Sequence, residues 1–318
     1  SGFIASLIQE YFHPSEFSVT TGGPDVAEQF AALPFDHLFF TGSGSIGKKV
    51  MRAAAENLTP VTLELGGTTP VIIDKSAKLK DAASSIIYGK LLNGGQTCIA
   101  PDYVLLEPSL QDEFIAELQT AAQAQFSNPE ELTGPIDERQ LDYWKHLVSD
   151  ALDRGAKVIP LLNNPGAGAR PFEPIALINV PPEARVLHEE IFGPILPIVA
   201  VADTTAAIAY VNNKPHPLAL YWFGKDKKNL QRVLNETRSG GVTVNDTLLH
   251  ITIEDLPFGG IGASGMGSYH GKAGFDTFSH QKSILEVRGF FGLNLFKGTK
   301  TARPPYGKMV EWLLRYLK

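Results

Sequence analysis

Short runs of β-branched and aromatic residues alternate with stretches of helical periodicity along most of this chain. The first of these units predicts a strand at 37–41, a helix at 48–57 and a second strand at 61–65. Further strand and helix patterns follow one another as far as residue 245. Because a strand, a helix and a strand in succession form a parallel βαβ unit, the alternation predicts an α/β fold with a largely parallel sheet.

Length and composition limit the class of protein. A chain of 318 residues with 43% apolar and 19% charged residues is long enough for two domains and is not typical of a disordered chain. The net charge of −6 argues against a nucleic-acid partner. The most apolar stretch, residues 191–202, is interrupted by Gly193, Pro194 and Pro197, so we expect no transmembrane segment.

The two ends of the chain differ from its middle. Residues 2–11 follow Ser1 directly and have the pattern of an amphipathic helix, from which we expect a fragment of a longer protein. Residues 289–318, the basic tail, hold six Lys or Arg and one acid, Glu311. The basic tail either packs on another subunit or binds an anionic surface through Trp312, Leu313, Leu314 and Leu317.

A glycine-rich segment lies between the first predicted strand and helix. Gly42-Ser-Gly-Ser-Ile-Gly47 fits GxGxxG, a pattern in which glycines let the backbone approach a diphosphate at a helix N-terminus. It also fits most of a P-loop, but Lys49 stands where that motif needs a Ser or Thr for magnesium. A tight turn without a ligand is the third interpretation. In the dinucleotide interpretation, Glu64 at the end of the next strand would hydrogen-bond a ribose.

The lone cysteine, Cys98, is the second candidate site. It excludes an internal disulfide and a Cys-rich zinc site, and it indicates a reducing compartment. A cysteine between apolar residues is usually part of the core. Cys98, however, follows a Gly94-Gly95 turn, where free backbone N–H groups would lower the thiol pKa and stabilise an oxyanion. No histidine lies nearby in the sequence, so Glu64 is the candidate base that activates water to hydrolyse an acyl-enzyme.

Four motifs occur together in the order and spacing of one protein family. They are Leu63-Glu-Leu-Gly-Gly67, Gly95-Gln-Thr-Cys98, Glu189-Glu-Ile-Phe-Gly-Pro194, and Leu256-Pro-Phe-Gly-Gly260 followed by Ser264-Gly265. Together they resemble the aldehyde dehydrogenase superfamily over essentially the whole chain. Ala100-Pro-Asp-Tyr103 and Val244-Asn-Asp-Thr-Leu-Leu-His250 are similar to the coniferyl aldehyde dehydrogenases of its class 3-like branch.

The resemblance implies a reaction and a set of site residues. Cys98 would attack the aldehyde carbon, its own N–H would help to hold the oxyanion, and Glu64 would activate water to hydrolyse the thioester. NAD, with NADP not excluded, would accept the hydride. No metal is expected. Glu190 would bind the nicotinamide ribose and Phe192 would pack beside the ring. The implied cofactor-binding residues are Gly42, Ser43, Gly47, Leu65, Glu190 and Phe192.

The resemblance also implies an architecture. It is a Rossmann-like aldehyde dehydrogenase fold with part of a nucleotide-binding domain at 1–65 and a complete α/β catalytic domain at 66–262. Residues 263–318 would form a return segment, an oligomerisation strand near 282–287 and the basic tail. About 150 family residues would precede Ser1, including an oxyanion-hole asparagine whose loss costs on the order of 10²–10³ in rate.

The resemblance finally implies partners, and it leaves two alternatives open. We expect a cytoplasmic homodimer that acts on a small, aromatic, coniferaldehyde-like aldehyde. One alternative is a cofactor-independent thiol esterase that uses Cys98 and Glu64. The other is a catalytically impaired fragment with a structural or interaction role.

Overall fold

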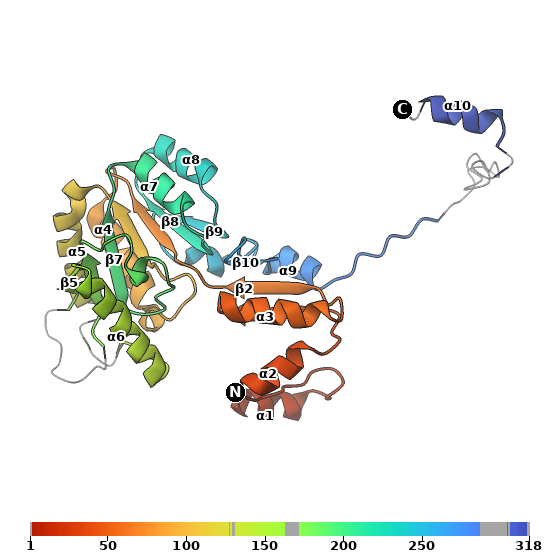
Figure 1. The fold of residues 1–318 in the computed structure, drawn as a ribbon, viewed down its shortest axis with the longest axis horizontal. Helices are drawn as coiled ribbons and strands as arrows, with labels where there is room; N and C mark the ends of the chain where they lie inside the picture. Colours follow the sequence, from red (N-terminus) through yellow and green to blue (C-terminus); the bar gives the residue numbers. More distant parts are fainter. Residues whose placement is uncertain are drawn as a thin grey trace. The chain divides into compact units, whose positions relative to one another are not determined.

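The computed structural model describes residues 2–126, 128, 131–162, 172–286, 304 and 306–316. The chain divides into two compact units, Ser1–Phe278 and Ser279–Lys318. Among the described residues, the first unit holds two β-sheets, one of three strands and one of seven (Figure 1). The site residues predicted from the sequence all belong to this first unit.

The smaller sheet has the strand order β1-β2-β10. β1 is parallel to β2, and β10 is antiparallel to it, so β2 is the central strand. Helix α3 packs on this sheet with Val50 and Ala54 buried (Figure 1). The elements of this region are α1 (Gly2–Tyr11), α2 (Pro24–Ala31), β1 (Leu38–Gly42), α3 (Gly44–Ala55), β2 (Val61–Leu65), β10 (Gly265–Met266) and α9 (Gly271–Thr277).

The larger sheet has the strand order β5-β6-β7-β4-β3-β8-β9. Its strands are parallel except for β5, which is antiparallel to β6. The observed sheets confirm the predicted α/β class with a largely parallel sheet. The strands are β3 (Pro70–Ile73), β4 (Tyr103–Leu106), β5 (Lys157–Pro160), β6 (Ile175–Ile178), β7 (Ile195–Ala200), β8 (Ala219–Phe223) and β9 (Gly241–Val244).

Two apolar cores lie on the two faces of the larger sheet, because alternate strand residues point to opposite sides. Val71 and Ile73 belong to one core, together with apolar residues of α4 and α5, whereas Ile72 belongs to the other, with residues of α6, α7 and α8. Both faces are therefore covered, as expected for parallel strands that read as continuous apolar runs. These helices are α4 (Leu79–Leu91), α5 (Gln111–Gln125), α6 (Glu138–Asp153), α7 (Thr204–Asn212) and α8 (Lys227–Glu236).

Three segments that carry predicted site residues lead into neighbouring strands of this sheet. Residues 66–69 lead from β2 into β3, residues 98–102 lead into β4, and residues 190–194 lead into β7. In the register of these parallel strands, Pro70 pairs with Tyr103 and Val104 pairs with Ile198. The amino ends of β3, β4 and β7 therefore lie side by side. The chain enters this edge of the sheet at β3, directly from the carboxyl end of β2.

The second unit contains helix α10 (Lys308–Tyr316) among its described residues. Trp312 and Leu314 are exposed there, whereas Leu317 and the side chain of Leu313 lie outside the described residues. Residues 282–286 form no strand within the single chain, and Val287 lies outside the described residues, so the oligomerisation strand stays a prediction. No described helix combines the length and apolar character needed to cross a membrane.

Candidate active site

The turn before Cys98 depends on three consecutive residues with left-handed backbone. Helix α4 ends at Leu91, and a short 3₁₀ segment follows in which Asn93, Gly94 and Gly95 have φ of 54°, 62° and 77°. A Cβ on Gly95 would stand 2.4 Å from the carbonyl oxygen of Gly193. Only glycine fits this conformation and this close approach, which places the turn against the segment that carries Glu190.

Hydrogen bonds hold the residues on either side of the thiol. The Gln96 side chain donates to the Gly134 carbonyl at 2.9 Å and accepts from the Ile136 N–H at 2.8 Å. On the other side, the Tyr221 hydroxyl donates to the Ile99 carbonyl at 2.7 Å. Cys98 is therefore fixed between two anchored neighbours, which is the rigidity that a reacting group requires.

The protonation state of Cys98 corrects one expectation. Cys98 is partly exposed as a residue, and the pKa of its thiol is raised to about 11, chiefly by burial and then by the charge of Glu190 and, more weakly, of Glu64. The backbone N–H groups of Cys98 and Ile99 do lower the pKa, as predicted, but they do not outweigh burial and two nearby carboxylates. At neutral pH the thiol therefore keeps its proton until a base removes it.

Glu64 lies in the centre of the smaller sheet, paired with Thr41 on one side and Gly265 on the other. It is only 4% exposed, and neither carboxylate oxygen has a hydrogen-bond partner among the described residues. Burial raises its pKa to about 7. A carboxyl group with this pKa exchanges a proton readily near neutral pH, as a general base must.

Tyr269 is a neighbour of both groups that the sequence analysis did not single out. Its pKa is raised by burial and by the charges of Glu64 and Cys98. Its backbone pairs with Phe258, and the two rings meet edge to face with centroids 5.7 Å apart. The sequence gives a weak signal for it, since Tyr269 follows the Ser264-Gly265 motif by only a few residues. Glu64, Cys98 and Tyr269 thus share one electrostatic environment.

Glu190 is a second carboxyl group whose charge acts on Cys98. Its carboxylate packs on Gly66, where a Cβ would stand 1.8 Å from Oε2, and it accepts a hydrogen bond from the backbone of Gly67. Burial, followed by the charge of Asp102, raises the Glu190 pKa to about 8. Glu190 therefore packs on the first two residues of the short link that joins the two sheets, directly after the end of the strand that carries Glu64.

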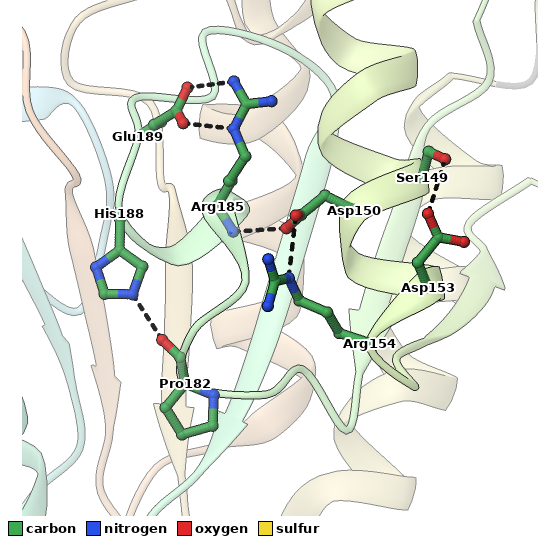
Figure 2. Close-up of polar contacts among 8 residues, drawn as sticks. All are labelled: Ser149, Asp150, Asp153, Arg154, Pro182, Arg185, His188 and Glu189. Atoms are coloured by element: carbon green, nitrogen blue, oxygen red, sulfur yellow. Dashed lines mark hydrogen bonds and ion pairs between the residues drawn. The ribbon is translucent and has the colours of Figure 1, made fainter.

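One hydrogen bond ties the segment before Glu190 to Asp150 of helix α6, and further contacts lie within the segment itself (Figure 2). The Arg185 N–H donates to Asp150 at 2.8 Å, and its guanidinium forms a salt bridge with Glu189 at 2.6 Å. His188 hydrogen-bonds the Pro182 carbonyl at 2.6 Å. These contacts fix the backbone from which Glu190 projects.

Phe192 is held by its backbone rather than by its ring. Its carbonyl accepts hydrogen bonds from the Gln140 side chain at 3.0 Å and the Trp144 indole at 3.1 Å, both on α6. Its φ of 45° is unusual for a bulky residue. Strain of this kind persists only where the surroundings enforce it, as in binding and catalytic sites.

The glycine-rich segment spans the junction of β1 and α3, but α3 begins at Gly44, four residues earlier than predicted, so only Ser43 lies between the strand and the helix. Ser43 is the N-cap of α3, and its hydroxyl accepts from the Ile46 N–H. Gly47 lies directly against Leu65, because a Cβ there would stand 2.6 Å from Cδ2 of that side chain. The exposed end of β1 and the first N–H groups of α3 leave a polar helix N-terminus, where an anion is stabilised.

Two further charged residues near the site were not predicted. Lys90 is fully buried on α4, and Asp102 is 3% exposed just before β4. Asp102 stands in Ala100-Pro-Asp-Tyr103, so a carboxylate directly before a buried strand was the available signal. There was no such signal for Lys90 in the sequence, because its position within α4 resembles that of any helical lysine.

Comparison with known proteins identifies the family. The aldehyde dehydrogenase family matches residues 2–284. A probable coniferyl aldehyde dehydrogenase of Pseudomonas aeruginosa is 47% identical over 314 residues, which cover 98% of this chain and 64% of that protein. The chain thus spans slightly less than two thirds of the length of this curated relative.

Solved structures agree with this match. Staphylococcus aureus AldH in its substrate-bound state has a TM-score of 0.86 and 37% identity, covering 99% of this chain and 68% of that chain. Mycobacterium tuberculosis aldehyde dehydrogenase complexed with NAD⁺ has a TM-score of 0.76 and 30% identity, covering 85% of this chain and 57% of that chain. The family match, the relative and the fold all agree, and this chain therefore belongs to the aldehyde dehydrogenase family.

Proposed function

We propose that this chain is the catalytic portion of an enzyme that oxidises an aldehyde to a carboxylic acid with a nicotinamide cofactor. One observation supports this most directly. Cys98, a partly exposed residue, interacts electrostatically with Glu64, a buried carboxyl group without a hydrogen-bond partner among the described residues. Burying such a group unpaired is costly, which favours a chemical role over a structural one.

Cys98 acts as the nucleophile. Because its pKa is about 11, it needs a base, and the Glu64 carboxylate accepts the thiol proton. The thiolate adds to the aldehyde carbon and forms a thiohemiacetal, and the Cys98 N–H stabilises the oxyanion. After loss of hydride the carbon is a thioester bonded to Sγ.

Glu64 acts again in the second half of the reaction. After releasing its first proton to solvent, it accepts a proton from a water molecule, which attacks the thioester carbon. The bond from Sγ to the carbon breaks, the carboxylic acid leaves, and Cys98 regains its proton. Its pKa of about 7 suits both transfers, because the group must be a base before each one.

The residues present fit a nicotinamide dinucleotide. Gly42, Ser43 and Gly47 would hold the diphosphate at the α3 N-terminus, with Leu65 beside them, because the missing Cβ of Gly47 lets the helix pack closely on β2. Glu190 would bind the nicotinamide ribose and Phe192 would pack beside the ring. When bound, the nicotinamide accepts the hydride. The NAD⁺ complex of the M. tuberculosis relative supports this class of cofactor, and NAD rather than NADP stays our proposal.

We propose an aromatic, coniferaldehyde-like substrate. Cys98 packs against the apolar core that contains Phe258 and Leu248, with Tyr269 and Ile251 at its edge. Flat aromatic aldehydes suit a pocket with aromatic and aliphatic walls. The P. aeruginosa relative named as a probable coniferyl aldehyde dehydrogenase supports the same class.

The deciding experiment follows both half-reactions separately. The chain is mixed with coniferaldehyde and NAD⁺, NADH is followed by absorbance, and acyl-enzyme is followed by intact mass. We expect Cys98→Ala to form no acyl-enzyme, and Glu64→Gln to accumulate it without turnover. Full turnover by Cys98→Ala would refute the proposal.

A thiol esterase is the second candidate, because Cys98 and Glu64 need no nucleotide for that reaction. The test is hydrolysis of an activated aryl ester without nucleotide, beside the NADH assay. Ester cleavage that requires Cys98, together with no NADH formation, would favour this alternative for the chain as it stands.

Three further properties belong to the proposal. A cytoplasmic location is supported by the lone cysteine, which suits a reducing compartment. A homodimer, paired through residues 282–287, is proposed from the family resemblance. The division into parts at 1–65, 66–262 and 263–318 is proposed on the same ground.

A further inference from the structure

Asp102 connects the loop 66–69, which follows the strand that carries Glu64, with the loop that carries Glu190. One carboxylate oxygen accepts the Thr69 N–H at 2.8 Å, and the other accepts the Ile191 N–H at 3.3 Å. The Asp102 N–H in turn donates to the Thr69 carbonyl at 2.8 Å. Thr69 ends the loop 66–69 that follows β2 and its Glu64, and Ile191 directly follows Glu190.

Asp102 also belongs to the segment that carries the nucleophile. It lies four residues after Cys98, and no regular element intervenes between them. Its two oxygens and its N–H therefore hold together three segments that are far apart in the sequence. A buried carboxylate that accepts two backbone N–H groups is a strong and directional connection.

Lys90 supplies the opposite charge. It is fully buried, its ammonium has no hydrogen-bond partner among the described residues, and its charge interacts with Asp102 and Glu190. An isolated buried ammonium would be costly, so the two carboxylates compensate it. Lys90 and Asp102 take no part in the proposed chemistry, yet the charges of both act on Glu190, whose own charge raises the pKa of the Cys98 thiol.

We infer that Asp102 is a positioning residue that fixes Glu190, and the loop 66–69 that follows Glu64, beside Cys98. This inference rests on the proposed function, since it assumes those three residues form the reacting site. Asp102 itself contacts none of the reacting atoms. It acts by holding the Thr69 and Ile191 backbone, so its removal would let the Glu190 carboxylate move away from the thiol.

The test uses alkylation of Cys98 by iodoacetamide, which needs neither aldehyde nor nucleotide. Since the chain has one cysteine, the labelling reports that thiol alone. Well below the thiol pKa, the rate follows the thiolate fraction, so a pKa lowered by one unit gives about tenfold faster alkylation. Rates are measured from pH 6 to pH 9 on the full chain and its variants.

Glu190→Gln should alkylate about tenfold faster at pH 8.5, because it removes a charge that raises the thiol pKa. Asp102→Asn should also be faster, by several-fold, because Glu190 is no longer held. The double variant should be no faster than Glu190→Gln alone, since the two changes act through one group. If Asp102→Asn speeds alkylation by the same factor in both backgrounds, or not at all, the inference is wrong.

Asp74→Asn is the matched control. Asp74 is also 3% exposed, and it lies at the other end of β3, where it accepts from Ser76, Thr204 and Asn229. This variant loses a buried carboxylate of the same kind, so it should lower the melting temperature without changing the alkylation rate. An equal change in alkylation for both variants would show general loosening and would overturn the inference.

A measurement on the unmodified chain applies even where Asp102→Asn does not fold. If Asp102 holds both loops as one unit, the amide protons of Thr69 and Ile191 should have protection factors that agree within about threefold. Free exchange of one amide beside strong protection of the other would contradict a shared anchor. If the chain forms no NADH but gives the expected alkylation rates and protection factors, the proposed function is refuted and the role of Asp102 is not.

Discussion

The carboxylate of Glu190 lies against the Cα of Gly66, so closely that a methyl group there would stand 1.8 Å from Oε2. Gly67, its neighbour, has room for a methyl group: a Cβ there would meet its nearest atom, the Cα of Pro217, at 3.7 Å, an ordinary van der Waals contact. Two adjacent glycines therefore differ in role. Gly66 leaves room for the Glu190 carboxylate, whereas Gly67 supplies an N–H that any residue but proline would keep.

Gly66→Ala should remove activity with little loss of stability. The obstructed group is the end of a flexible side chain, so Glu190 can move away, and it then loses its hydrogen bond to Gly67. We expect the free energy of unfolding to fall by about 1 kcal/mol, and NADH formation to fall on the order of 10²-fold because a binding group is misplaced. Urea unfolding and the coniferaldehyde assay measure these two quantities.

Gly67→Ala is the control for that variant, since it changes the adjacent residue and keeps the N–H. It should retain NADH formation within a few-fold of the unsubstituted chain. Equal losses of activity in the two variants would mean that the glycine pair needs general backbone freedom, and that Gly66 has no particular relation to Glu190.

The Glu64 pKa of about 7 predicts the pH dependence of thioester hydrolysis. The carboxylate is the active base, so single-turnover decay of the acyl-enzyme should accelerate as pH rises through 7 and level off above 8. Stopped-flow mixing of preformed acyl-enzyme into buffers from pH 5 to pH 9 measures this profile. An inflection near pH 7 that persists in Glu64→Gln would assign it to another group.

The same group makes a prediction about stability. Its pKa is raised from 4.5 in the unfolded chain to about 7 in the folded one, so the folded state binds the proton more tightly. Stability due to this group is therefore lost as pH rises from 4.5 to 7 and is constant above. Glu64→Gln, which stays neutral, should gain in melting temperature relative to the unsubstituted chain over that range. A difference that does not vary with pH would contradict it.

The sequence was sufficient to single out the two proposed catalytic groups, because their signals are local. Glu64 and Cys98 each stand beside a glycine pair, and the structure brings their charges together. The strand predicted at 61–65 matches β2 residue for residue, and the strand predicted at 37–41 is shifted by one residue from β1. Such elements are predicted well because periodicity and turn residues define them without tertiary contacts.

What the sequence could not predict depends on contacts between distant segments. β10 has two residues, and it is a strand only because Gly265 and Met266 pair with β2. β3 begins at a proline, which argues against a strand except at the first position. The role of Asp102 needs Thr69 and Ile191 at once, 33 and 89 residues away. Hydrophobic periodicity in a single sequence gives no signal for contacts between residues so far apart.

Gly47→Ala should weaken cofactor binding. Its Cβ would stand 2.6 Å from Cδ2 of Leu65, which is 6% exposed and has little space to move. Overpacking of this kind costs about 1–3 kcal/mol and would displace the first turn of α3 from β2. Isothermal titration with NAD⁺ should show an affinity lowered about tenfold or more, if a misplaced helix N-terminus costs about 1.4 kcal/mol.

Gly44→Ala controls for the loss of a glycine in the same helix. A Cβ on Gly44 would meet its nearest atom, the Ala263 carbonyl oxygen, at 3.9 Å, which is ordinary contact. This variant should therefore unfold in urea within about 0.5 kcal/mol of the unsubstituted chain, whereas Gly47→Ala should lose about 1–3 kcal/mol. Equal losses of stability in the two variants would mean that packing of α3 on Leu65 is not the cause.

Gly95→Ala should damage both folding and thiol reactivity, whereas Gly155→Ala should damage neither strongly. Both glycines have positive φ, 77° and 102°, so both variants carry backbone strain of about 1 kcal/mol. They differ in the room around an added Cβ: on Gly95 it would stand 2.4 Å from the Gly193 carbonyl oxygen, whereas on Gly155 it would have nothing within 4 Å.

A backbone oxygen cannot move aside as a side chain can, so Gly95→Ala must separate the Cys98 turn from the segment that holds Glu190. We expect it to lose about 3 kcal/mol of unfolding free energy in urea and to alkylate Cys98 faster, because the thiol loses a nearby carboxylate. Equal effects of the two substitutions would mean that strain alone matters, and that the contact between residues 95 and 193 does not set the environment of the thiol.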